Sequence, residues 1–425
     1  MEPRVDEREW VQYQWPYLVT LLGGEAKINE LAYRTGAFVR KREVQSPADL
    51  LQMLMIWAVA ERSLRETVTL ASEAGLAELS DVALLQRLKR AGPWIGGLLG
   101  EMLTQRQDVF AEGTRVRLID ASAIARIGHR GTDLRVHLGL DLGLNCTDSI
   151  DITDGRGAES LDRFTFLPGE IVLADRGYAH RKALARVSEA GAHFVVRLPW
   201  SSIPLEDHEG KPFDLFAALR SLPEATAGAF PVQFRVSKSS VLCRLVAIRK
   251  TEAVAAKARQ HAISESRRHG TVTDPRTLEA AGYFFVLTNL PDKYTASKVL
   301  ELYRLRWQIE MKFKNLKSVL HLGEVPARNG ELFKVYVMAK LLVALVIENL
   351  ISGESFSPWG YPIADTEPLR LSRFLLDLLI DAIKPHLTFK RARRRRAARR
   401  RHFSNPPRKR KNQRIAAIIL CGGLS

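Results

Sequence analysis

The sequence has few of the residues that build disulfide frameworks and zinc sites. Its 425 residues include only three cysteines, Cys146, Cys243 and Cys421. Their spacing matches neither a disulfide framework nor a zinc site, and the ten histidines are not clustered. We therefore expect no structural metal site made of cysteine and histidine.

Long apolar runs are also missing. The longest, at residues 335–347, contains Lys340 and is shorter than the roughly 20 residues that a membrane-spanning helix needs. The N-terminal "MEPRVDEREW" is charged and no apolar run follows it, so it does not resemble a signal peptide. We expect a cytoplasmic protein with no membrane partner. The 46% hydrophobic content is enough for two or three structural units, each with a core.

Acidic residues are absent from residues 382–425, which hold 15 of the 64 lysines and arginines. The net charge of +17 therefore lies mostly in this segment, and the rest of the chain is nearly neutral. Such basic segments are often flexible tails that bind nucleic acid through its phosphates. A solvated tail with no dedicated partner is the alternative interpretation.

Apolar periodicity predicts that residues 1–110 are helical, with clear patterns at residues 47–60 and 83–103. Between these patterns, residues 64–91 read as a helix, a turn at Gly75 and a second helix that begins at Ser80 as N-cap. This layout is typical of a helix-turn-helix, although any packed corner of two helices has the same pattern.

From Thr114 the pattern changes to that of a mixed α/β sheet. Strands are predicted at residues 114–120, 134–142, 146–154, 169–178 and 193–200, with a helix at 179–192. Asp120 and Asp175 are each expected at the carboxyl end of a strand, where functional sites cluster.

The remaining sequence reads as a β-rich insertion followed by helices. Strand patterns at residues 230–250 and 283–291 flank a helix-prone stretch at 251–280, and helices are predicted at 303–317, 332–351 and 370–383. The predicted domains are residues 1–110, helical; 111–198, first part of the core; 199–292, insertion; 293–380, helical completion of the core; and 381–425, the basic tail.

The stretch "YRLRWQIEMKFKNLK", residues 303–317, contains one acid among five cations. If it forms one helix, Tyr303, Arg306, Glu310 and Lys317 fall within roughly 60° of arc and make a polar stripe beside an apolar one. Glu310 is then either a functional acid or the partner of a helical ion pair with Arg306 or Lys314.

Asp120, Asp175 and Glu310 together suit a divalent metal, because Mg²⁺ and Mn²⁺ prefer oxygen ligands. Two such ions about 3.5–4 Å apart activate an attacking oxygen and stabilise a leaving one in phosphoryl displacement. Taken alone, an aspartate after a strand is more often a turn or cap residue. Nearby cations, such as Arg176, are suited to holding phosphates.

The spacing Tyr303-x2-Arg306-x3-Glu310-x6-Lys317 matches the Y-R-E-K signature of bacterial DDE transposases of insertion-sequence family four. "LIDASAI" and "VLADRGY" resemble that family's regions around its first and second catalytic aspartates. The resemblance covers most of the chain. It implies an RNase H-like mixed-sheet catalytic core of α/β class with a β-rich insertion, preceded by an all-helical N-terminal domain that recognises DNA ends.

The resemblance further implies that Asp120, Asp175 and Glu310 bind two Mg²⁺ ions, for which Mn²⁺ substitutes. Tyr303, Arg306 and Lys317 would contact DNA phosphates, with Arg176 as a further clamp. The implied reaction is cut-and-paste transposition: hydrolysis at the insertion-sequence ends, then attack of the 3′-OH on target DNA. The implied partners are double-stranded DNA, as terminal inverted repeats and target, and a second copy of the chain when two ends are paired. The implied location is the bacterial nucleoid.

Three residues are open to two interpretations. Phe284 stands where relatives that form a DNA hairpin have a base-stacking tryptophan, but "YFFV" also reads as a buried strand. For Trp307, packing beside Tyr303 is the simpler interpretation. For His137, a core histidine with a satisfied hydrogen bond is favoured over a functional one.

Two other functions remain as alternatives to a transposase. One is a catalytically inactive, sequence-specific DNA-binding protein derived from a transposase, although none of the three acids is lost. The other is a simple RNase H-like nuclease, which would not need the basic tail, the N-terminal helices or the Tyr-Arg-Lys stripe.

Overall fold

The computed structural model describes residues 15–107, 115–129, 131–142, 146–237, 239–322, 325, 329–352 and 368–384. The predicted basic tail lies outside these residues from position 385 onward. The chain forms two compact units, one of residues 1–101, 327–347 and 358–425 and the other of 102–326 and 348–357. No helix within the described ranges is long and apolar enough to cross a membrane.

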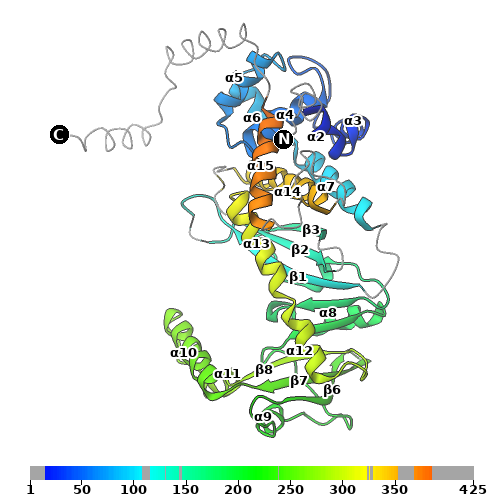
Figure 1. Ribbon diagram of the computed structural model, residues 1–425, viewed down its shortest axis with the longest axis vertical. Coiled ribbons are helices and arrows are strands. Elements are labelled where there is room, and N and C mark those ends of the chain that lie inside the picture. The colour runs from blue at the N-terminus through cyan, green and yellow to red at the C-terminus, as the bar shows by residue number, and fades with distance from the viewer. Residues whose placement is uncertain are drawn as a thin grey trace, which may run out of the picture. The chain divides into compact units, whose positions relative to one another are not determined.

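The first unit is built of helices joined by short loops in its described residues, as predicted (Figure 1). Its helices, two of which continue into the second unit, are α2 (Trp15–Leu21), α3 (Gly24–Arg34), α4 (Pro47–Ala58), α5 (Leu64–Ala74), α6 (Asp81–Arg90), α7 (Gly92–Gln107), α14 (Gly330–Ser352) and α15 (Pro368–Ile383). Residues of α4 are buried along its whole length, which makes it the central helix of the unit. It packs against α3, α5 and α15.

The predicted two-helix corner is present. Helix α5 begins with a capping box, in which Ser63 and Glu66 satisfy each other's backbone N–H groups. It ends at Gly75, whose φ of 75° lies in the left-handed region that glycine adopts without strain. The Ser80 hydroxyl accepts a hydrogen bond from the backbone N–H of Ala83 and so begins α6.

The second unit is built on one sheet of eight strands in the order β3-β2-β1-β4-β5-β8-β7-β6. The first five are β1 (Val116–Ile124), β2 (Leu134–Asp141), β3 (Cys146–Asp154), β4 (Ile171–Ala174) and β5 (His193–Arg197). Strands β1, β2 and β3 are antiparallel neighbours, whereas β4 and β5 run parallel to β1. Helix α8 (Arg181–Glu189) joins β4 to β5. This is the predicted RNase H-like mixed sheet.

The predicted insertion continues this sheet. Its strands are β6 (Ala227–Val236), β7 (Ser239–Arg249) and β8 (Tyr283–Thr288), and β8 pairs antiparallel with β5. The helix-prone stretch forms α10 (Glu252–Arg268) and α11 (Pro275–Ala281), and a short α9 (Leu215–Arg220) precedes β6. Apolar residues of β1, β4, β5, β7, β8 and α8 share one core on a single face of the sheet.

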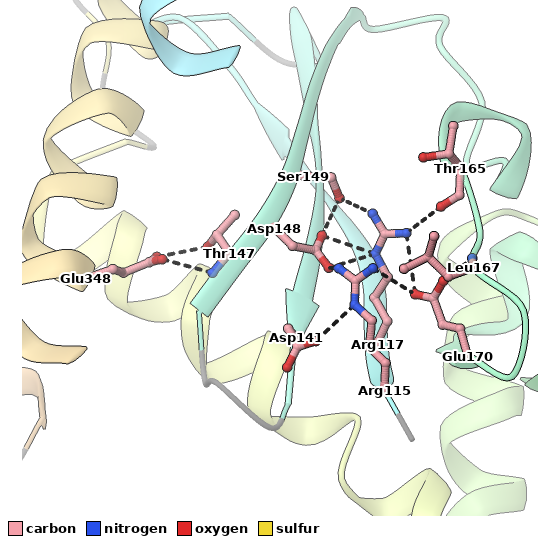
Figure 2. A network of polar contacts seen from close by, with 10 residues as sticks. All are labelled: Arg115, Arg117, Asp141, Thr147, Asp148, Ser149, Thr165, Leu167, Glu170 and Glu348. Atoms are coloured by element: carbon pink, nitrogen blue, oxygen red, sulfur yellow. Dashed lines mark hydrogen bonds and ion pairs between the residues drawn. The ribbon is translucent and has the colours of Figure 1, made fainter. Parts of the chain in front are cut away.

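A buried ionic network joins the start of β1 to its neighbours (Figure 2). Arg117 pairs with Asp148 and donates to the carbonyl of Thr165 and the hydroxyl of Ser149. Arg115 pairs with Asp141 and with Asp148. These charges are paired inside the protein. A shift in the register of β1, β2 and β3 would leave buried charges unpaired, so the network favours the observed register.

The predicted single helix at residues 303–317 is two helices in the structure, α12 (Ala296–Arg304) and α13 (Trp307–Val319). At the junction the N–H groups of Leu305 and Arg306 bond to carbonyls three residues back, which is 3₁₀ geometry. The prediction of one continuous helix was wrong here. The apolar stripe on α13 is confirmed, because Ile309, Phe313 and Leu316 are buried.

Candidate active site

The two predicted aspartates lie side by side across neighbouring strands. The parallel pairing of β1 with β4 ends at Ile119 opposite Ala174, so Asp120 and Asp175 are the next residues of the two strands. Asp175 follows β4 directly and begins a 3₁₀ turn at Arg176–Tyr178. Asp120 was predicted to lie at the end of its strand. It does not, because β2 continues to pair with β1 as far as Ile124.

Arg306 links two of the three acids. Its Nη1 donates to Asp120 Oδ2 at 3.2 Å, and its Nη2 forms a very close ion pair with Glu310. The guanidinium is largely buried, with 13% of the side chain exposed. The nearby negative charge of Asp175 helps to raise the pKa of Arg306. The ion pair between Arg306 and Glu310, predicted as one alternative, is therefore present. Arg306 also bonds to Asp120 and interacts with the charge of Asp175.

Burial raises the pKa of Asp120 to about 6. The N–H of Ala121, donating to Oδ1, and the charge of Arg306 oppose this shift. The nearby charges of Asp175 and of Glu159, an acid in the loop after β3, raise the pKa further. Asp120 is thus a carboxyl group in a crowded acidic site whose ionised form requires a nearby cation.

Glu310 lies on α13 at the edge of an open cleft of about 550 Å³. Asp120, Lys314 and Lys317 also line this cleft, together with Ser122 and Ser318. The Glu310 side chain is 55% exposed and Lys317 is exposed as well. The cleft therefore places two of the acids beside two lysines in a region open to solvent.

Tyr303 is buried and not on an exposed edge of a helix, contrary to the prediction. Its hydroxyl donates to Asp175 Oδ1 at 3.2 Å, and its ring packs against Phe284 with centroids 5.4 Å apart. Phe284 is half-buried at the start of β8, and the Arg197 guanidinium lies over its ring at 5.5 Å from the centroid. Trp307 does not fill the expected packing position, because it is 56% exposed.

Two cations of the site were not predicted. Ala174 pairs with Val196 in the parallel ladder of β4 and β5, so Arg197 occupies the position beside Asp175. Burial lowers the pKa of Arg197, and the charge of Arg176 lowers it further. The pKa of Lys250 is lowered by burial and by both arginines. Arg176, Arg197 and Lys250 therefore lie close enough to repel one another, and a bound anion would relieve that repulsion. The end position of the strand at residues 193–200 was a signal that could have identified Arg197.

His137 is a core residue, as favoured. It is fully buried on β2 and its Nε2 lies 3.0 Å from Thr153 Oγ1, whereas Nδ1 finds no hydrogen-bond partner among the described residues. Burial lowers its pKa to about 4. The histidine is therefore neutral at physiological pH.

The chemistry of the three acids fits a divalent metal, because each offers carboxylate oxygens from a strand or helix. Their present arrangement is organised around the Arg306 guanidinium instead. In the described ranges, no three side chains of Asp, Glu, His or Cys are gathered closely enough to hold a metal ion. Asp120 and Glu310 would have to give up their contacts with Arg306 to become ligands.

Known proteins of similar sequence are transposases. The family described as "Transposase DDE domain" matches residues 113–346. The chain is 37% identical to the InsL protein for insertion sequence element IS186A of Escherichia coli and to the transposase for insertion sequence element IS421 of the same species. Each match covers 79% of this chain and 94% of the relative. The transposase for IS231F of Bacillus thuringiensis is 26% identical over 45% of this chain and 43% of its own.

Proposed function

The chain belongs to the DDE transposases of insertion-sequence family four, and from this premise we propose that it cuts DNA at the ends of an insertion sequence and joins the freed 3′-OH to target DNA. The observation that carries the proposal is the adjacency of Asp120 and Asp175 on parallel strands, with Glu310 linked to Asp120 through Arg306. The three acids come from distant parts of the sequence; Asp120 and Glu310 line one cleft, and Asp175 lies beside Asp120 on the neighbouring strand.

Dependence on a divalent metal follows from the family. We propose that Asp120, Asp175 and Glu310 hold two Mg²⁺ ions, with Mn²⁺ able to replace them. Bound there, the ions would lower the pKa of the attacking water or 3′-OH and stabilise the leaving oxygen. The raised pKa of Asp120 supports this role, since a buried carboxylate near other acids gains most from a bound cation.

DNA phosphates would be held by the cations around the acids. We assign Arg306, Lys317 and Arg176 to this task, with Tyr303 as a phosphate contact and as the residue that orients Asp175. Arg197 and Lys250 extend the same basic locality. Cations that repel one another are stabilised when an anion comes between them, and a phosphodiester supplies that anion.

The helical unit would recognise the ends of the element. A hollow of about 700 Å³ lies between residues 36–43 and α6, and four arginines line it: Arg40, Arg42, Arg87 and Arg90. Gln86 is exposed on the same helix, where its amide is free to reach a base edge. This surface supports DNA reading by the two-helix corner rather than packing alone.

Pairing of two DNA ends would bring two copies of the chain together, so we propose a homodimer on DNA. The basic tail would add non-specific affinity for both DNA partners. The three acids are all present, and this favours an active enzyme over the inactive DNA-binding alternative.

The test is cleavage of a labelled duplex that carries the element's own terminal repeat, with Mg²⁺. Glu310→Gln should abolish cleavage and leave specific DNA binding within a few-fold, as should Asp120→Asn and Asp175→Asn. Glu301→Gln is the matched control, because Glu301 is an exposed glutamate on the preceding helix α12. Equal cleavage by wild type and Glu310→Gln would return Glu310 to a helix ion pair. Tight binding without cleavage by wild type would favour the inactive DNA-binding protein.

A further inference from the structure

Glu348, near the end of α14, is a buried acid that contacts β3 and α13 within the sheet unit. Its two carboxylate oxygens accept hydrogen bonds from the backbone N–H and the hydroxyl of Thr147, at 2.9 and 2.8 Å. Figure 2 shows this pair on β3, on the side away from the Arg115 and Arg117 network. The third contact is a close ion pair with Lys312 of α13. Only 7% of the Glu348 side chain is exposed, so these contacts are shielded from solvent.

Lys312 and Glu310 lie on opposite flanks of α13. The buried residues Ile309, Phe313 and Leu316 define the side that faces the sheet. At 100° per residue, Glu310 lies about 90° to one side of this stripe and Lys312 about 70° to the other. One flank of the helix therefore carries the acid of the candidate active site, and the other is tied to Glu348.

We propose that Glu348 is a positioning residue that fixes the rotation of α13 about its axis. It ties Lys312 to the backbone of β3 and so keeps Glu310 turned toward Asp120. The stripe of apolar contacts alone resists rolling weakly, because apolar packing is not directional. The inference rests on the proposed role of Glu310 as a metal ligand.

A small roll is enough to matter. Side chains extend about 5–6 Å from a helix axis, so a roll of about 20° moves the Glu310 carboxylate by about 2 Å. A displacement of about 1 Å at a reacting centre costs as much as a hundredfold in rate. Loss of the tie would therefore weaken metal binding and slow cleavage. Lys317 on the same helix would move with Glu310, whereas Arg176 and the helical unit would keep their contacts with DNA.

Glu348→Gln and Lys312→Met test the tie from its two ends. Gln retains an acceptor for the Thr147 N–H but loses the charge that holds Lys312. Met retains the apolar stem of Lys312, and Lys312→Arg restores a cation at the same position. Glu61→Gln is the matched control, because it breaks another glutamate–lysine pair that involves α14, that of Glu61 with buried Lys340, and leaves Glu348, Thr147 and Lys312 in place.

The first readout is Mn²⁺ binding without DNA, measured from the electron paramagnetic resonance signal of free Mn²⁺. Glu348→Gln and Lys312→Met should weaken binding at least fivefold, while Lys312→Arg and Glu61→Gln stay within twofold of wild type. The second is the single-turnover cleavage rate on saturating end DNA, which should fall at least tenfold in the same two variants, while the Kd for DNA changes by no more than about threefold.

Wild-type affinity for Mn²⁺ and wild-type cleavage by Lys312→Met would overturn the inference. Equal losses of Mn²⁺ affinity and cleavage in Glu61→Gln would also overturn it, because the effect would then come from a less stable α14 and not from the contact between Glu348 and Lys312. Lys312→Met leaves Glu348 bonded to Thr147, so it decides the matter if Glu348→Gln does not fold. Failure of the wild type itself to cleave would instead overturn the proposed function, and the tie would still be read from Mn²⁺ binding.

Discussion

At the scale of single residues, His137 shows how burial turns a titratable side chain into a pH-dependent element of stability. Its folded-state pKa is lowered from 6.5 to about 4, so the folded protein keeps it neutral while the unfolded chain binds a proton below about pH 6.5. The resulting stability is present above that pH and is lost as the pH falls toward 4.

Between pH 7 and pH 5, we expect the free energy of unfolding to fall by about 2 kcal/mol more in wild type than in His137→Gln. Urea unfolding of both proteins at the two pH values measures this difference. His208→Gln is the control, since it makes the same substitution at an exposed histidine. If wild type and His137→Gln had parallel pH profiles, the assigned burial effect would be refuted.

The same scale separates what sequence predicts about the site from what it does not. The positions of Asp120 and Asp175 follow from strand patterns, and the parallel register brings them together. Arg197 follows from the same register, since it comes directly after Val196 at the end of β5, but no sequence motif distinguishes it from the other arginines. The Arg306 bridge to Asp120 joins residues 186 positions apart, and no local pattern specifies such a contact.

At the scale of elements, helix and strand identities were predictable and some of their limits were not. The break between α12 and α13 has no proline or glycine to mark it in "YRLRW". It coincides with two tertiary contacts, Tyr303 with Asp175 and Arg306 with Asp120. Likewise β1 runs beyond Asp120 because β2 pairs with it, and β8 joins β5 to extend the core sheet. These features depend on partners that are distant in sequence.

The buried network at the start of β1 gives a prediction about this element. Asp148 is fully buried and pairs with both Arg115 and Arg117. Asp148→Asn would remove the anion that hydrogen-bonds to both guanidinium groups, which should lower the free energy of unfolding by about 3–5 kcal/mol. Urea unfolding followed by circular dichroism measures the change.

Glu170→Gln is the matched control in the same network. Burial raises the pKa of Glu170, and its Oε1 has no hydrogen-bond partner among the described residues. That oxygen lies 3.7 Å from Arg115 and 3.6 Å from Arg117, beyond hydrogen-bond distance. A neutral amide of the same shape should therefore cost less than about 1.5 kcal/mol. Equal losses in the two variants would show that the network does not depend on the Asp148 charge.

At the scale of the whole molecule, charge is divided unevenly along the chain. Residues 382–425 hold 15 basic and no acidic side chains, so the remainder, with its local basic clusters, is nearly neutral overall. Binding of DNA without regard to sequence depends on phosphate neutralisation, and each neutralised phosphate of B-DNA contributes a slope of about −0.9 to log K against log [salt]. The tail should therefore dominate the salt dependence of non-specific binding.

Removal of residues 388–425 is expected to make that slope shallower by several units on random duplex DNA, measured by fluorescence anisotropy across a salt series. Specific recognition of the terminal repeat should persist, since the arginines lining the hollow beside α6 remain. A full-length variant with glutamine at every lysine and arginine of residues 388–425 separates charge from length and should match the truncation. An unchanged slope in both variants would mean that the tail is a solvated segment. The electrostatic part of DNA binding would then come from cations elsewhere in the chain, such as those around Asp120 and Asp175.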